Sequence, residues 1–103
     1  MNKQRRQEIS KIVYWLEKIE KIEDKPLLKT LTNNLENVLS DEEDMFNNIP
    51  ENLLNSLRAS DSEESIDAMN EAIDLLNQAM DEEDVEEFTT KIEEAIIELE
   101  VIV

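Results

Sequence analysis

Residues 66–80 read IDAMNEAIDLLNQAM, and this stretch decides the fold. Its large apolar side chains recur at alternating spacings of three and four residues, at Ile66, Met69, Ile73, Leu76 and Met80. These spacings place the side chains on one face of an α-helix, in the a/d pattern of a helix that packs along a partner. The stretch therefore predicts a long amphipathic helix whose apolar face is covered by other helices.

The same helical period occurs nearer the start of the chain. It predicts a first amphipathic helix with the apolar positions Ile9, Ile12, Val13, Leu16, Ile19 and Ile22. Pro26 lacks an N–H donor and disfavours helical geometry at the preceding residue, so we expect a break or kink near residues 23–26. A second helix follows, and its apolar face consists of Leu27, Leu28, Leu31, Leu35, Val38, Leu39 and Phe46.

Polar residues and proline mark the next boundaries. Asn47 and Asn48 offer cap or turn chemistry, and Pro50 suits the first position of a helix. We expect that helix to be short and to run through Leu53, Leu54 and Leu57.

The helix of residues 66–80 has signals at both ends. Ser60, with Glu63 three residues later, fits a capping box that opens it. Its register is lost in the acidic segment 81–84 and restarts in a different phase at Val85, Phe88, Ile92, Ala95, Leu99 and Ile102. Two helices joined by a turn at residues 81–84 are slightly favoured over one bent helix. No strand pattern competes, although the β-branched residues within 99–103 could end the chain in an extended form.

These periods predict an all-α fold, a bundle of four to five amphipathic helices, with residues 1–103 as a single acidic helical domain. Glycine is absent, where a chain of this length would usually contain about seven, so tight hairpins and phosphate-binding loops are not expected. Histidine and cysteine are also absent, which excludes imidazole bases, thiol nucleophiles, disulfides and the usual zinc sites.

Charge is strongly negative and unevenly distributed. The net charge is −17, yet residues 1–30 hold eight basic and five acidic side chains, whereas residues 31–103 hold 22 acidic side chains against only Arg58 and Lys91. The acidic helices thus lack the Glu-to-Lys pairs that usually support solvated helix faces. We expect the basic first helix of the same or another protomer, or a cationic partner, to offset this repulsion.

Carboxylates at three-residue spacing raise one enzymatic alternative. Magnesium-dependent all-α enzymes that hydrolyse nucleoside triphosphates use such pairs, and the chain offers Glu17 with Glu20, Glu64 with Asp67, and Glu71 with Asp74. Pairs at this spacing also arise by chance in so acidic a chain, and few basic residues are present to hold phosphates. We therefore expect no enzymatic activity, no cofactor and no metal site.

One acidic surface is not fully explained by solubility. Glu64, Asp67, Glu71 and Asp74 form a stripe beside the apolar face of the helix of residues 66–80. Acids four residues apart on a helix rise about 6 Å, which is comparable with phosphate separations along a DNA strand. The stripe is the candidate partner-binding site, acting by imitation of nucleic acid, and the alternative is that it provides solubility and excludes wrong partners.

Basic residues near the start form a second candidate surface. Lys11, Lys18 and Lys25 repeat at seven-residue spacing, opposite the apolar face of the first helix. The net charge opposes contact with nucleic acid or anionic lipid, so we expect no direct nucleic-acid partner and no membrane partner. These lysines should instead pair with the acidic helices. A sponge for a small anionic signal, held by Arg5, Arg6 and the lysines, is a further alternative.

Two groups of apolar residues predict packing or self-association. Tyr14 and Trp15 are expected to be core or interface anchors. Residues 85–102 carry more apolar side chains than the single stripe through Phe88, Ile92 and Leu99 requires. The additional apolar residues outside or beside that stripe are Ile96, Ile97, Val101 and Val103. We expect this surplus to be buried against another protomer, giving a homo-oligomer through coiled-coil-like seams.

Segments for export or membrane insertion are not expected. The basic start is followed by an apolar run of only five residues, Ile12–Leu16, which is too short for a signal peptide. The longest apolar runs are far shorter than a membrane span. A cytoplasmic protein is therefore expected.

The order of several segments resembles a known group of proteins. The chain opens with MNKQRR at residues 1–6, continues with DEEDMFNNIPENL at residues 41–53 and with Ser56, and then has EAIDLL at residues 71–76. In this order it resembles small, acidic, helical proteins carried by bacteriophages and prophages of Gram-positive bacteria. The resemblance covers most of the chain. It departs from the group at the Lys25-Pro26 break and at the acidic segment 81–84.

The resemblance implies a phage context, in which small acidic proteins are often inhibitors of host defence or of host nucleic-acid machinery. Combined with the acidic stripe, it leads to a functional hypothesis. The protein would be a non-enzymatic binding protein in the bacterial host cytoplasm that inhibits a basic host protein, of anti-defence or nucleic-acid-handling type, by acidic DNA mimicry. The rival hypothesis is a structural, self-assembling helical module whose acidity keeps it soluble.

Overall fold

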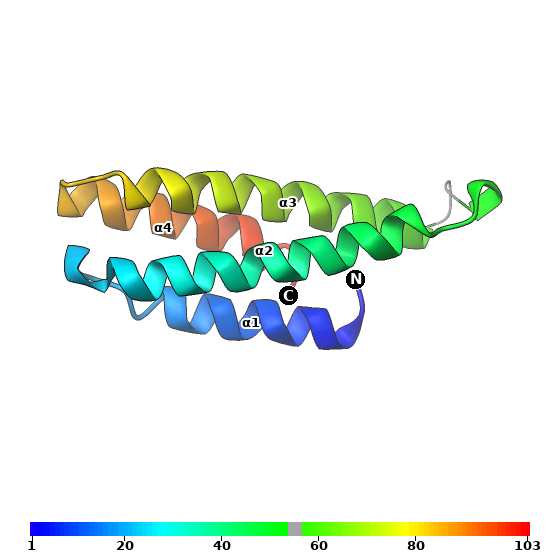
Figure 1. Cartoon of the computed structure of the whole chain (residues 1–103), viewed down its shortest axis with the longest axis horizontal. Coiled ribbons are helices and arrows are strands. Elements are labelled where there is room, and N and C mark those ends of the chain that lie inside the picture. Colours follow the sequence, from blue (N-terminus) through cyan, green and yellow to red (C-terminus); the bar gives the residue numbers. More distant parts are fainter. Residues whose placement is uncertain (54–56) are drawn as a thin grey trace.

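The computed structural model describes residues 1–53 and 57–103, and at positions 57 and 58 it describes the backbone alone. This part of the chain contains four α-helices, α1 (Lys3–Leu16), α2 (Lys25–Asn47), α3 (Leu57–Met80) and α4 (Val85–Glu100). Two short 3-10 helices lie in the connections, η1 (Ile22–Asp24) and η2 (Glu51–Leu53). The α-helices run alternately up and down along one long axis (Figure 1), which confirms the predicted all-α bundle.

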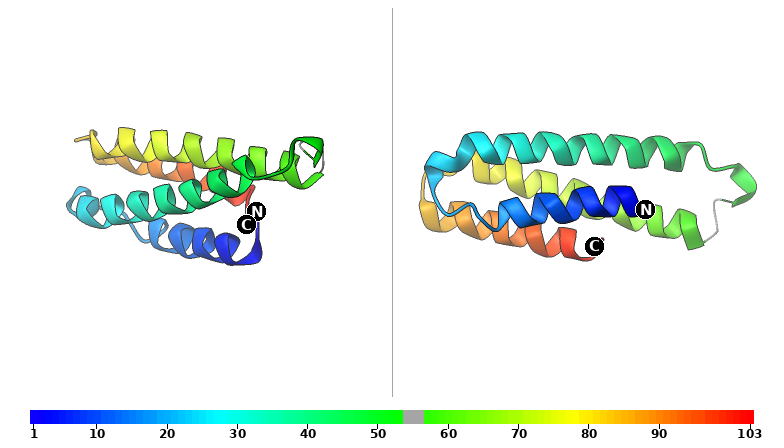
Figure 2. Two further views of the ribbon diagram at one scale, coloured as in Figure 1. Left: turned by 45° about the vertical axis from the view of Figure 1, so that its right-hand side comes forward. Right: turned by 90° about the horizontal axis from the view of Figure 1, so that it is seen from below.

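Each helix packs mainly against two neighbours. α2 and α4 both contact α1 and α3, so that α1 and α3 lie diagonally across the bundle (Figure 2). α2 and α3 have 23 and 24 residues, whereas α1 and α4 have 14 and 16. The long pair therefore extends beyond the short pair at one end of the molecule, and both chain termini lie near the point where the short helices stop (Figure 1).

An apolar cluster runs through all four helices. Its large, fully buried members are Ile9, Leu16, Leu28, Leu35, Met69, Leu76, Phe88 and Leu99. Burial of each such side chain stabilises the fold by about 1.5–3 kcal/mol relative to exposure. These residues all belong to faces that the helical periods predict, so the predicted pattern of the core is largely confirmed.

Small side chains line much of the buried face of α3. They are Ser62, Ser65, Ala68, Ala72 and Ala79. Ala95 of α4 is buried as well, and small residues at a contact let two helices approach closely. The predicted seam positions Ile66 and Met80 are only partly buried, because the centre of the buried face is shifted toward these small residues.

The first helix is shorter than the sequence predicts. α1 ends at Leu16 and α2 starts at Lys25, so a break between the first two helices is confirmed, but it begins earlier than the expected residues 23–26. The chain leaves the helix through bonds of the tighter 3-10 type, in which an N–H donates to the carbonyl three residues earlier, Lys18 to Trp15 and Ile19 to Leu16. Pro26 lies in the first turn of α2, where no N–H donor is needed, and so it opens a helix instead of breaking one.

α3 begins before the predicted capping box. Its first residue is Leu57, so Ser60 and Glu63 both lie inside the helix and the capping-box prediction is wrong. The helix expected after Pro50 appears as the 3-10 turn η2. Leu54, together with the side chain of Leu57, lies outside the described residues.

The acidic segment 81–84 is a turn between two helices. α3 ends at Met80 and α4 begins at Val85, which confirms the favoured prediction of two helices. Asp84 caps α4, since its carboxylate accepts a hydrogen bond from the Glu86 N–H at 2.9 Å. α4 continues to Glu100 and a turn follows at residues 101–102, so the segment 99–103 considered for an extended end forms no strand.

Several residues expected in the core are exposed. Leu27 and Val85 are 37% and 50% exposed, because each lies in the first turn of its helix at the end of the bundle. Tyr14 and Trp15 are 53% and 49% exposed. Their prediction as core anchors is wrong for this chain, and their role as interface anchors stays a prediction.

Candidate partner-binding face

The four predicted site residues lie together on the solvent side of α3. Glu64, Asp67, Glu71 and Asp74 are all exposed, and we call them the acidic face. They share one side of the helix because they are separated by three, four and three residues, which keeps successive side chains on neighbouring turns. The helix is fixed beneath them by the buried residues of its opposite side, so the carboxylates are presented on a rigid support.

The acidic face is not neutralised within the described part of the chain. The ion pairs in the described residues are made by other carboxylates, those of Glu8, Glu42 and Asp61. Neighbouring carboxylates three or four residues apart on a helix repel each other by about 0.2–0.5 kcal/mol per pair. The acidic face therefore opposes helix stability, and a cation from outside the bundle would relieve that repulsion.

α4 supplies further residues beside the acidic face. An open groove of about 370 Å³ lies between the two helices and is lined by Glu64, Asp67, Ala68, Glu71, Glu98 and Val101. We call it the acidic groove. Asp74 does not line it, so the structure brings three of the four predicted residues together with Glu98. Sequence reasoning missed Glu98, because its nearness to α3 depends on how the two helices are rotated against each other.

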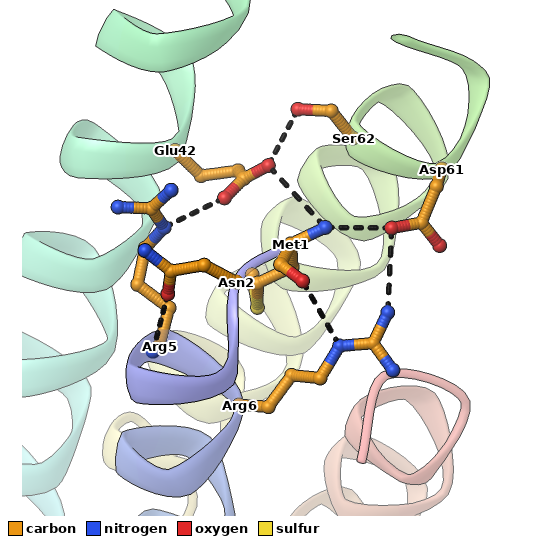
Figure 3. A network of polar contacts seen from close by, with 7 residues as sticks. All are labelled: Met1, Asn2, Arg5, Arg6, Glu42, Asp61 and Ser62. Carbon is orange, nitrogen blue, oxygen red and sulfur yellow. Dashed lines mark hydrogen bonds and ion pairs between the residues drawn. The ribbon is translucent and has the colours of Figure 1, made fainter. Parts of the chain in front are cut away.

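A second polar cluster is buried where the amino terminus meets α2 and α3 (Figure 3). The Glu42 side chain is 0% exposed. Its carboxylate accepts hydrogen bonds from Arg5 Nε at 2.8 Å and from Ser62 Oγ at 2.5 Å. The ammonium group of Met1 lies 3.9 Å from its Oε2 atom. A buried carboxylate is tolerated only when it is paired and hydrogen-bonded in this way.

Asp61 extends the cluster toward the surface. Its Oδ2 atom accepts hydrogen bonds from the Met1 ammonium at 2.6 Å and from the guanidinium of Arg6 at 3.3 Å. The Met1 hydrogen bond, together with the charges of the Met1 ammonium and of Arg6, lowers the pKa of Asp61 against a smaller opposing effect of burial. This cluster ties the first turn of α1 to both long helices.

The cluster occupies the arginines on which the sponge alternative depends. Arg5 and Arg6 are both paired with carboxylates, so a small anionic ligand would have to displace Glu42 or Asp61. Sequence reasoning missed Glu42 as a buried residue. A signal was present, because Glu42 lies seven residues after Leu35 and so continues the apolar stripe of α2.

The predicted lysine pairing is not observed in the described residues. Lys11 Nζ lies 3.7 Å from a carboxylate oxygen of Glu8 on the same helix, and Lys18 Nζ lies 4.9 Å from the centre of the Tyr14 ring. Pairing of the basic segment with the more acidic helices is made instead by Arg5 and Arg6, whose carboxylate partners lie on α2 and α3.

The carboxylate pairs do not assemble into a metal site. No group of three or more acidic residues in the described ranges is arranged to hold a metal ion. Within the same ranges, no helix is both long enough and apolar enough to cross a membrane.

Comparison with known proteins gives no family. No protein-family model, curated protein or solved structure matches this chain.

The buried Glu42 carboxylate should be required for stability because of its charge. Glu42→Gln keeps the size of the side chain but weakens the charge-assisted hydrogen bond from Arg5, and we expect the free energy of unfolding to fall by about 1.5–3 kcal/mol. Glu43→Gln removes the same charge from an exposed neighbour and should change the free energy of unfolding by less than about 0.5 kcal/mol. Urea unfolding followed by circular dichroism measures both. Equal effects of the two variants would contradict the assignment.

The ion pairs of Asp61 should give a stability contribution that depends on pH. Because its pKa in the folded protein lies below the value of about 3.9 in an unfolded chain, the contribution is complete above that value and is lost as pH falls through the folded pKa. The difference in Tm between the wild type and Asp61→Asn should therefore shrink between about pH 6 and about pH 3. Asp41→Asn, at an exposed site, is the control, and a difference that grows on acidification would refute the expected sign.

Proposed function

We propose that this protein is a non-enzymatic, phage-type inhibitor that binds a basic, nucleic-acid-handling host protein through its acidic face. The observation that carries the proposal is the exposure of four carboxylates on one side of α3 without an ion pair in the described residues. Natural helices usually intersperse basic residues on such faces. A face that weakens its own helix is better explained by a partner than by packing.

The spacing of the carboxylates supports DNA mimicry. Glu64 and Asp74 are ten residues apart, which corresponds to a rise of about 15 Å along the helix. Asp67 and Glu71 are separated by about 6 Å along the same axis. Phosphates of one DNA strand repeat about every 3.4 Å along the helix axis, so the interval of about 6 Å corresponds to about two phosphate steps and that of about 15 Å to about four. A protein groove lined by Lys and Arg for phosphates can therefore be matched by this row of carboxylates.

The distribution of charge supports a basic partner. Residues 31–103 carry 22 acidic and two basic side chains, whereas basic side chains are in excess in residues 1–30, and α3 lies on the opposite side of the bundle from the basic helix α1. A surface of one sign increases the rate at which an oppositely charged protein associates with it. The basic residues of α1 therefore do not mask the acidic face from such a partner.

The structural alternative has one observation in its favour. Ile97 and Val101 of the α4 region are 63% and 75% exposed, and they lie on one side because they are four residues apart. Exposed apolar residues of this kind commonly mark protein contacts. They are compatible both with a partner protein and with self-assembly, so they do not weaken the proposed inhibitor.

Reversing the charge of the acidic face should abolish partner binding. The test immobilises the wild type and the variant Glu64→Lys, Asp67→Lys, Glu71→Lys, Asp74→Lys, and captures proteins from a bacterial lysate. Proteins bound by the wild type should be lost from the variant and should be eluted by added duplex DNA or by high salt, because the contact is electrostatic. Circular dichroism should show that helicity is retained.

A control variant carries the same change in net charge on another helix. The exposed acids Glu36, Asp41, Glu43 and Asp44 of α2 are changed to lysine, and this variant should keep the captured proteins. If the α3 variant still binds all of them and DNA does not compete, the inhibitor proposal is wrong and the structural alternative is favoured.

A further inference from the structure

α1 presents an exposed surface that combines aromatic rings with basic side chains. It consists of Lys11, Tyr14, Trp15 and Lys18, all exposed, and we call it the basic-aromatic face. The rings of Tyr14 and Trp15 meet edge to face with centroids 5.4 Å apart, and Lys18 lies over the Tyr14 ring. Tyr14 and Trp15 lie in the last turn of α1 and Lys18 follows its end, and the exposure of all four side chains shows that no other helix in the described part of the chain covers this surface.

The acidic groove has complementary chemistry. Glu64, Glu71 and Glu98 supply negative charge along its length. Val101 lies in the groove and Ile97 lies one turn earlier on α4, and both are exposed apolar side chains. The groove can therefore accept a surface that offers both cations and apolar rings.

We propose that the basic-aromatic face of one copy of this chain binds in the acidic groove of a second copy, so that copies associate head to tail. The two surfaces are complementary in charge. The basic-aromatic face offers two ammonium groups, Lys11 on α1 and Lys18 just after the end of that helix, and the groove offers the carboxylates of Glu64 and Glu71, which are separated by a rise of about 10.5 Å along α3. Each lysine can meet a carboxylate, with the rings of Tyr14 and Trp15 against the apolar side chains of the groove.

The net charge of −17 does not prevent this contact at physiological salt. Charges are screened over about 8 Å in such a solution, whereas the bundle is 18–20 Å thick. The charges that decide the contact are therefore those at the two surfaces, which are opposite in sign. At very low salt the repulsion between whole copies reaches further, so association should be strongest at intermediate salt concentrations.

The two surfaces are on different sides of the bundle, since α1 and α3 are diagonally opposed. Such an interface is heterologous, because each copy contributes a different surface, and assembly can continue beyond a dimer. The acidic groove includes residues of the acidic face, so a copy that fills the groove would compete with the basic host protein proposed above. The self-association itself requires no host protein and does not rest on the proposed function.

Sedimentation velocity of two charge-reversed variants tests the proposal. The face variant is Lys11→Glu, Lys18→Glu, and the groove variant is Glu64→Lys, Glu71→Lys. The wild type should form dimers and larger species as its concentration rises, whereas each variant alone should associate at least about tenfold more weakly. Mixing the two variants should restore association, because the groove of the face variant and the α1 of the groove variant are both intact.

A control variant, Lys21→Glu, Lys29→Glu, has the same charge change at exposed positions away from the basic-aromatic face and should associate like the wild type. A wild type that remains monomeric at all salt concentrations, or a mixture of variants that remains monomeric, would overturn the proposal. The proposal would also be overturned if the wild type is monomeric and binds vesicles of anionic lipid or a single-stranded oligonucleotide, and the face variant does not. The basic-aromatic face would then bind a different ligand. Failure of self-association would leave the result of the lysate capture unchanged, so the two proposals can fail separately.

Discussion

The burial of the Glu42 carboxylate is the interaction on which the arrangement of this chain depends. An unpaired carboxylate at that depth would be strongly unfavourable, so the amino-terminal segment must bring Arg5 to it, and α3 must place Ser62 beside it. The same geometry brings the Met1 ammonium to Asp61. The start of α1 is thereby fixed against both long helices (Figure 3), at the point where the short helices end and the long pair extends beyond them (Figure 1).

This use of the basic segment explains why the acidic face is left without cations. The arginines of residues 1–30 are engaged with Glu42 and Asp61, and the exposed lysines of α1 belong to a helix that lies diagonally across the bundle from α3. The carboxylates of the acidic face therefore remain exposed with like charges as neighbours. Proteins commonly retain such a loss of stability where a surface has a function, which is the physical basis for proposing a cationic partner.

Much of the fold follows from sequence periodicity, because apolar residues at spacings of three and four must be buried on one side of a helix. Helix ends were predicted less well. The end of α1 at Leu16 depends on where the chain must reverse to reach α2, and Pro26 is compatible both with a break and with a helix start. The exposure of the acidic face was predictable, because its residues lie out of phase with the apolar positions of the same helix. The contribution of Glu98 was not, because it depends on the rotation of α4 against α3.

The central claim is that the acidic face opposes folding and is not required by it. The most direct test compares the free energy of unfolding of the wild type with that of Glu64→Gln, Asp67→Asn, Glu71→Gln, Asp74→Asn, by urea unfolding at low and at high NaCl. Relief of three like-charge neighbours should make the neutralised variant more stable by about 1 kcal/mol at low salt, and screening should reduce that difference at high salt. A neutralised variant that is less stable than the wild type at low salt would show that the carboxylates support the fold, contrary to this account.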